Sequence, residues 1–175
     1  MKFKNTIASL AIGLITLSTA ASAETWVSIG KGPKSEGGGT SLAIGFKGAS
    51  NWGFALGGVF NSEYSSSDVL NYPVPHNNYT VLGEKRVDNS LGFDALYFID
   101  ASETVKPYVG LGLYTNNKKT LARSNSTGWI YTQHDTSGVV VSGEVGLQAK
   151  TASGLVFGIG FHNIRGASLS IGKQF

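Results

Sequence analysis

Apolar residues recur at every second position in eight segments of the chain, with small or polar residues between them. Side chains of a β-strand point alternately to opposite faces, so this period of two predicts strands with one apolar face. The expected strands cover residues 24–30, 40–47, 51–60, 87–99, 105–115, 139–149, 154–162 and 167–175. In the last of them Leu169, Ile171 and Phe175 share the apolar face, whereas Ser168 and Ser170 lie on the other. Such segments of about ten residues, separated by turn residues, are typical of membrane-spanning barrels.

The connections between these segments differ in length in a regular way. Short ones cover residues 48–50, 100–104 and 150–153, whereas longer ones cover 31–39, 61–86 and 116–138, with one short exception at 163–166. Short periplasmic turns and long extracellular loops are the pattern of outer-membrane barrels. An even strand number then places both termini of the mature chain in the periplasm.

The alternative all-β fold is a soluble eight-stranded barrel of lipocalin type, with its apolar face inside. The composition of the non-apolar face argues against it. That face carries many small residues, among them Ser41, Gly45, Gly92, Gly110, Gly112, Ser142, Gly146, Gly158 and Gly160. Glycines weaken a strand that faces water, but a narrow barrel interior has little room for larger groups. The sequence therefore predicts an all-β, eight-stranded antiparallel up-and-down transmembrane β-barrel.

The first 23 residues have the form of a secretory signal peptide. Lys2 and Lys4 precede an apolar run over 7–17, and 21–23 read Ala-Ser-Ala, so we expect cleavage after Ala23. The signal peptide would thus cover 1–23 and the barrel domain 24–175. Removing Lys2 and Lys4 leaves 14 − 2 = 12 basic residues against 11 acidic ones, a net charge of +1. This near-neutral balance gives no reason to expect a nucleic-acid partner, and the chain has no cysteine to supply a thiolate.

Aromatic residues fall near both ends of the expected strands. Phe46, Trp52, Tyr97 and Phe175 would lie near the periplasmic rim, and Phe60 and Phe161 near the opposite one. Two aromatic girdles around an aliphatic band are expected at the headgroup levels of a bilayer. Lys173 fits this outward face poorly, although its ammonium group can reach the headgroups from the rim.

Together these features make the mature chain resemble the small OmpA/OmpX/opacity-type barrels of the porin-family outer-membrane β-barrel proteins. The resemblance implies the outer membrane of a Gram-negative cell, contact with its lipid and lipopolysaccharide, and recognition of Phe175 by the barrel-assembly machinery. Lys173 departs from the family pattern, in which the third residue from the end is commonly aromatic. Family members act as adhesins, tethers, evasion factors or lipid-modifying enzymes, so the fold does not select a function.

A polar cluster is expected in the lumen. We place Lys47, Asp94, Lys106, Glu144 and Gln148 on the inward face, with His162 at its extracellular end. Charges in a narrow lumen need partners or water, and two bases can neutralise two acids. The cluster is interpreted as a structural plug, with a gated narrow pore as the alternative.

Catalysis has little support in the sequence. The lipid A deacylases use a His and a Ser two residues apart, but here the segment is His162-Asn163-Ile164. The palmitoyltransferases use extracellular His, Asp and Ser residues, which His76, His134 and Asp135 with loop serines could supply. Such residues are common in any solvated loop, and adjacency in sequence is no evidence of a nucleophile and its base. We therefore expect no enzyme activity, no cofactor and no metal, and keep a lipid A-modifying enzyme as a second alternative.

The expected extracellular loops are the main candidate for a functional surface. Lys85, Arg86, Lys118 and Lys119 would lie beside lipopolysaccharide phosphates, or form an ordinary solvated face, and Arg165 is placed on the same side. The loops also carry Tyr64, Tyr72, Tyr79, Trp129 and Tyr131, residue types enriched at interaction hot spots. The sequence therefore indicates a structural or surface-interaction role, with adhesion or binding to an extracellular protein partner as the hypothesis.

Overall fold

The computed structural model of the chain describes residues 23–34, 38–60 and 62–175. The expected signal peptide lies outside the described residues apart from Ala23. No helix within these described ranges is long and apolar enough to cross a bilayer.

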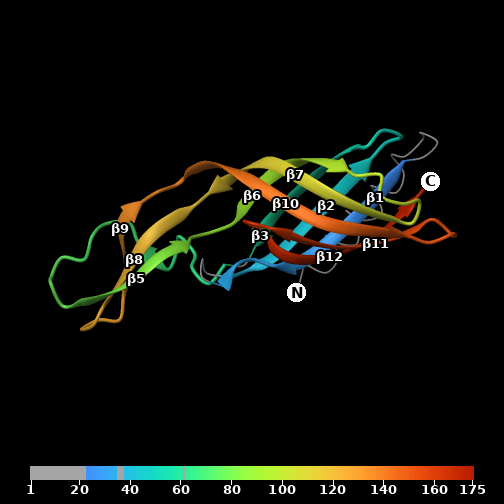
Figure 1. Cartoon of the computed structure of the whole chain (residues 1–175). Helices are drawn as coiled ribbons and strands as arrows, with labels where there is room; N and C mark the ends of the chain where they lie inside the picture. The colour runs from blue at the N-terminus through green and yellow to red at the C-terminus, as the bar shows by residue number, and fades with distance from the viewer. Residues whose placement is uncertain (1–22, 35–37, 61) are drawn as a thin grey trace.

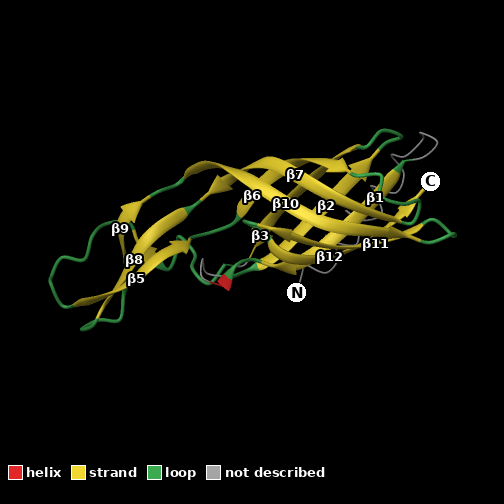
Figure 2. Ribbon diagram, in the orientation of Figure 1, coloured by secondary structure: helices red, strands yellow, loops and turns green. Residues whose placement is uncertain are grey.

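Eight strands close into one antiparallel barrel (Figures 1 and 2). They are β1 (Glu24–Lys31), β2 (Thr40–Lys47), β3 (Trp52–Phe60), β6 (Ser90–Phe98), β7 (Val105–Asn116), β10 (Gly138–Lys150), β11 (Leu155–His162) and β12 (Gly166–Gln174). Each barrel strand pairs with the barrel strands before and after it in the chain, and β1 pairs with β12 to close the ring. The up-and-down topology predicted from the sequence is therefore confirmed, with strand ends differing from the expected ones by at most three residues.

The two ends of the barrel differ in their connections. Short turns after β2, β6 and β10 lie at the end where Glu24 pairs with Gln174, which we call the turn end. The opposite end, the loop end, carries the long connections.

Two of these long connections are not loops, which corrects the sequence prediction. Residues 61–86 and 116–138 were expected as loops, but they contribute β4 (Val69–Leu70), β5 (Tyr79–Arg86), β8 (Lys118–Ser124) and β9 (Ile130–Asp135). These strands form a separate sheet in the order β4-β9-β8-β5, which we call the projecting sheet. Figure 1 shows it extending from the loop end, where β7 runs on into β8 and β9 leads back to β10.

The outer surface of the barrel is an apolar belt. Its members are the alternate residues of each barrel strand, and they include Ile29, Phe54, Leu56, Phe93, Leu111, Val141, Val145, Ile159 and Leu169, all exposed. In water such a continuous surface would be unfavourable, whereas hydrocarbon requires it. The fold is thus a transmembrane barrel with its apolar faces outward.

The rim at the turn end carries aromatic contacts. The Trp52 and Tyr97 rings meet edge to face with centroids 5.1 Å apart. Lys173 Nζ lies 5.7 Å from the Phe175 ring centroid, a cation–π distance. This contact, together with the position of Lys173 at the rim, explains how a lysine can be accommodated on the outer face of the barrel.

The lumen is filled by large side chains, although the sequence suggested mainly small ones. Each of three buried rings faces a glycine across the strand pairing: Trp26 faces Gly45 and Gly172, Tyr108 faces Gly146, and Tyr114 faces Gly92. A Cβ on any of these four glycines would overlap the facing residue. The glycines therefore make room for rings from the neighbouring strands, and no open channel is needed to explain them.

Candidate functional sites: the lumen cluster and the projecting sheet

Aromatic and aliphatic side chains close the lumen toward both ends. Trp26, Leu96, Phe98 and Tyr108 form a buried group with Ala55, and Val59, Tyr114 and Ile164 form another. The Trp26 and Phe98 rings lie 5.8 Å apart and the Phe98 and Tyr108 rings 5.3 Å apart.

A buried ion cluster lies among these side chains, centred on Asp94 of β6. Asp94 accepts hydrogen bonds from Tyr114 Oη (2.7 Å), Ser142 Oγ (2.8 Å), His162 Nε2 (3.1 Å) and Arg165 Nη2 (3.2 Å). Arg165 Nη2 also donates to Glu144 Oε2 at 2.7 Å. These four donors, one of them the guanidinium that also bonds Glu144, offset the cost of taking both carboxylates out of water. We call Asp94, Glu144, His162 and Arg165 the lumen cluster.

Gly112 makes room for the contact between Asp94 of the lumen cluster and Ser142. Asp94 pairs in register with Gly112, which pairs with Ser142, so the two polar side chains lie on either side of a residue with no side chain. A Cβ on Gly112 would overlap Asp94 and lie 2.8 Å from Ser142 Oγ. Because Gly112 leaves this space, Ser142 on β10 can donate a hydrogen bond to Asp94 on β6 across the intervening strand β7.

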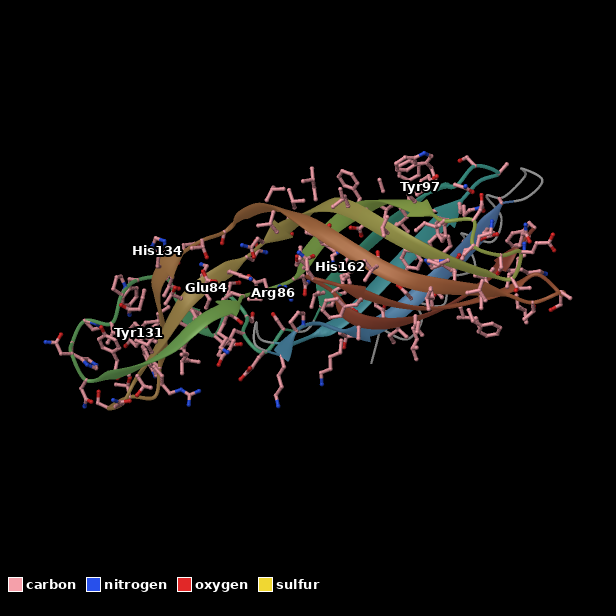
Figure 3. All side chains as sticks on the ribbon, in the orientation of Figure 1. Glu84, Arg86, Tyr97, Tyr131, His134 and His162 are labelled. Carbon is pink, nitrogen blue, oxygen red and sulfur yellow. The ribbon has the colours of Figure 1, made fainter. Side chains whose placement is uncertain are left out.

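The hydrogen bonds of His162 select one tautomer of its imidazole ring. Its Nδ1 accepts the backbone N–H groups of Ile164 and Arg165, each at 3.0 Å. The proton of the neutral ring therefore lies on Nε2, which donates to Asp94. Figure 3 shows His162 within the barrel.

This hydrogen bonding argues against metal binding or catalysis at the cluster. Ligand atoms of Asp94, Glu144 and His162 lie within 4.8 Å of one another, the one such grouping among the described residues. However, Arg165 Nη2 already contacts both carboxylates, and neither ring nitrogen of His162 offers a free lone pair. Ser142 donates to Asp94 and not to His162, and the Asp94 carboxylate already accepts from Tyr114, His162 and Arg165, so it is not free to act as a base for Ser142.

The residues expected in the lumen fall into separate places. Asp94 and Glu144 meet in the cluster, whereas Lys47 and Gln148 are buried elsewhere in the interior, with Lys47 Nζ 5.7 Å from the Phe98 ring centroid. Lys106 binds Asp100 at the turn end, at 2.9 Å. The positive partner of the two acids is Arg165, which the sequence placed on the extracellular surface and which is instead 2 % exposed. The sequence gave no signal that Arg165 points inward, because residues in a four-residue connection follow no alternation that would show the direction of a side chain.

A second network lies at the turn end, where it joins two turns to the start of β7. Asn51 Nδ2 donates to Asp100 Oδ2 at 2.6 Å, and Lys106 Nζ donates to Oδ1. The hydrogen bond from Asn51, followed by that from Lys106, holds the pKa of Asp100 below its ordinary value.

The four basic residues expected beside lipopolysaccharide do not form one patch. Lys85 pairs in register with Lys119, and Arg86 with Lys118, so the two pairs occupy opposite faces of the projecting sheet. Arg86 is 1 % exposed and its Nη2 donates to Ile164 O at 3.5 Å, so it belongs to the interior at the loop end (Figure 3). Lys119 Nζ bonds Asp135 at 3.3 Å and Asn71 at 3.1 Å. Because its side chain is buried, Arg86 does not present its charge at the surface where a lipopolysaccharide contact was expected.

His76, which lies in the segment before β5, is not arranged as a base. His76 Nδ1 accepts the Asn78 N–H at 3.2 Å, so His76 Nε2 carries the proton and donates to Ser124 Oγ at 3.1 Å. A general base would need the opposite direction for that bond. The Asp135 carboxylate accepts hydrogen bonds from Ser137 and Lys119. These bonds, and chiefly those from Ser137, hold the pKa of Asp135 below its ordinary value.

One face of the projecting sheet has a small hydrophobic core. Tyr64, Val69, Val87 and Leu121 are buried together, with Leu82 and Ile130 packed against them. Burial raises the pKa of the Tyr64 phenol. The sheet is therefore an ordered structure with its own packing.

Comparison with solved structures finds several similar chains, among them structures of Ail. The crystal structure of Ail, the attachment invasion locus protein of Yersinia pestis, is 12% identical over 87% of this chain and 95% of that one, with a TM-score of 0.41. Ail in complex with the heparin analogue sucrose octasulfate has the same identity and coverage, with a TM-score of 0.39. The backbone structure of Ail in a phospholipid bilayer nanodisc is 14% identical over 87% of this chain and 99% of that one, with a TM-score of 0.43. No family model and no curated protein matches the chain.

Identities this low, with TM-scores below 0.5, say nothing of function. The class of the protein follows from its own strand pairing and apolar belt: it is an eight-stranded transmembrane β-barrel with a filled lumen. Its resemblance to the small outer-membrane barrels holds for this architecture.

Proposed function

We propose that the protein resides in the outer membrane and acts at the cell surface through the projecting sheet. The observation that carries this proposal is the sheet itself: four strands with a buried core of their own stand beyond the apolar belt. In an outer-membrane barrel the long connections are extracellular, so the sheet would face the surroundings of the cell. Ordering so many residues outside the membrane costs conformational entropy. A barrel with a purely structural role would not require these residues to be ordered.

A narrow pore is the weaker candidate. Large rings occupy the lumen on both sides of the ion cluster, and Arg165 holds the two acids together. We infer that the lumen cluster is a structural plug that fixes strands β6, β10 and the last hairpin to one another. Planar-bilayer recordings of the refolded protein should show no discrete conductance steps.

Lipopolysaccharide contact and assembly are further parts of the proposal. Lys85 and Lys118 lie where the projecting sheet joins the barrel, at the expected level of headgroup phosphates. Phe175 would serve as the terminal signal for the barrel-assembly machinery, and its backbone N–H donates to Ala23 O at 2.9 Å. Catalysis is not part of the proposed function.

The test is removal of the projecting sheet with the barrel kept intact. Replacing residues 120–134 by Asn-Gly joins Lys119 to Asp135, which already pair in register, and a short linker replaces 66–84. Arg86 and the lumen cluster remain. We expect the shortened protein to keep its heat-dependent gel mobility and to lose the adhesion that the full chain confers on a non-adherent host strain. Undiminished adhesion would contradict the proposal.

A further inference from the structure

The far end of the projecting sheet presents aromatic rings on one face. Tyr79 pairs in register with Ser124, and the Ser124 N–H donates to Trp129 O at 2.9 Å, so Tyr79 and Trp129 lie on the same face on either side of Ser124. Strands lie about 4.8 Å apart, which separates the two positions by roughly 10 Å. The next row on this face is Val81, Ala122 and Tyr131. We call Tyr72, Tyr79, Val81 and Trp129 the tip face.

These side chains are accessible and are held on a rigid support. Trp129 is 60% exposed, Tyr72 51% and Tyr79 37%. The Tyr72 ring packs edge to face on Tyr131 at 5.6 Å. The hairpin that carries Trp129 is tied to the segment before β5, because Asn125 bonds both Thr80 and Asn78 at 2.8 and 3.0 Å. The rings are therefore presented on ordered backbone, which limits the entropy lost on binding.

The surroundings of the tip face are polar but almost uncharged. Residues 71–81 and 122–134 contain one Asp, Glu, Lys or Arg residue, Arg123, among several Asn, Ser and Thr. Arg123 pairs with Ile130 and Thr80, so it lies on the opposite face. Lys85 and Lys118 lie at the other end of the sheet, next to the barrel. Lys119 Nζ reaches Asn71, the residue before Tyr72, but its charge is paired with Asp135. A polyanionic ligand needs several cations close together, and the tip face has only this one paired lysine beside it.

The edge of the sheet is less suited to binding than this face. In the described chain β5 pairs with β8 alone, so its other side is an open edge. That edge has a bulge between Val81 and Gly83, where Gly83 has φ +82°, and it carries Lys85. Bulges and lysines on edge strands oppose the addition of another strand.

On these grounds we propose that the tip face binds an uncharged carbohydrate. The apolar C–H face of a pyranose ring packs against a Trp or Tyr ring. Tyr79 and Trp129 lie on one face, on either side of the His76 side chain that bonds Ser124, and would contact successive sugars. Sugar hydroxyls both donate and accept hydrogen bonds, as do the Asn, Ser and Thr side chains nearby. This inference rests on the proposed surface role and names the chemistry of the partner.

The experiment uses the full chain refolded into phosphatidylcholine nanodiscs, which contain no lipopolysaccharide, on an array of neutral and sulfated oligosaccharides. We expect binding to a subset of neutral glycans. Trp129→Ala and Tyr79→Ala should each weaken it about tenfold, equivalent to roughly 1.4 kcal/mol. Tyr79→Phe keeps the ring and should retain binding, and Arg123→Gln on the opposite face is the matched control that should change nothing. Unchanged heat-dependent mobility verifies that each variant folds.

Three outcomes would overturn the inference: no neutral glycan bound, sulfated glycans preferred and lost with Arg123→Gln, or a protein bound by the tip face with no glycan. The sheet-removal experiment separates this from the proposed function. If adhesion depends on the projecting sheet while no neutral glycan binds, the surface role stands and the carbohydrate inference fails. If adhesion survives removal of the sheet, the proposed function itself fails.

Discussion

Arg165 Nη2 lies 2.7 Å from Glu144 Oε2, which ties the connection between the last two strands to β10 across the lumen. The same nitrogen reaches Asp94 on β6 at 3.2 Å. One side chain thus joins three parts of the barrel wall that are far apart in the sequence.

Loss of Arg165 should destabilise the barrel strongly. Arg165→Gln removes the positive charge and leaves two buried carboxylates uncompensated, an effect of about 3–5 kcal/mol. Urea unfolding in lipid vesicles, followed by tryptophan fluorescence, measures the change in the free energy of unfolding. Lys106→Gln is the control, since it removes the solvent-exposed pair with Asp100, and its effect should be far smaller. Equal effects of the two variants would contradict the role given to Arg165.

Gly112 should tolerate no side chain. Gly112→Ala places a Cβ against the backbone carbonyl of Phe93 and against Asp94, and near Ser142 Oγ, and overpacking of this kind costs about 1–3 kcal/mol. Gly143→Ala on the same sheet is the matched control, because a Cβ there meets nothing within 4 Å. Folding yield, measured by heat-dependent gel mobility, should fall for the first variant alone. A normal yield for Gly112→Ala would mean that the Asp94–Ser142 contact is not required.

The apolar belt predicts a depth-dependent cost for a charge. Leu111 lies in the middle of β7 and is 69% exposed on the outer face, so Leu111→Arg should destabilise the barrel by about 2–4 kcal/mol. Leu155 begins β11 opposite Lys173 at the rim, so Leu155→Arg should cost about 0–1 kcal/mol. Unfolding in vesicles of defined thickness compares the two. Similar costs at both positions would argue that the belt does not lie in hydrocarbon.

Asp100 should titrate below its ordinary pKa of 3.8. The carboxylate is favoured in the folded state by Asn51 and then Lys106, so its contribution to stability is present above the unfolded pKa and is lost as the pH falls through the lower folded pKa. The NMR titration of the Asp100 carboxyl carbon measures this midpoint. Asn51→Ala should raise it toward 3.8, and a midpoint at or above 3.8 in the unmodified protein would contradict the hydrogen bonding described.

The barrel could be predicted from the sequence because lipid imposes a simple rule on it. A residue such as Leu111 must face hydrocarbon and its neighbour Gly112 must face the lumen, and this alternation is visible without any other information. The projecting sheet follows no such rule. Its strands are interrupted by bulges at Val81/Gly83 and Thr120/Leu121, which break the period of two.

The lumen cluster could be predicted only in part. Asp94 and Glu144 were expected inside because they lie on inward positions of long strands. Arg165 was missed because it lies in a connection, where side-chain direction depends on the backbone hydrogen bonds that His162 Nδ1 accepts. The rings that fill the lumen were missed because glycines also indicate a narrow interior, whereas Gly45, Gly92, Gly146 and Gly172 each make room for a ring on a neighbouring strand.

In the proposed orientation the projecting sheet lies outside the cell and the turn end lies on the inner side of the outer membrane. The chain has no cysteine, so single-cysteine variants can be labelled without background. Asn77→Cys lies on the exposed segment before β5, and Ala152→Cys in the turn between β10 and β11. A membrane-impermeant maleimide applied to intact cells should label Asn77→Cys at once and Ala152→Cys only after the outer membrane is permeabilised. Labelling of Ala152→Cys on intact cells, or protection of Asn77→Cys, would contradict the account.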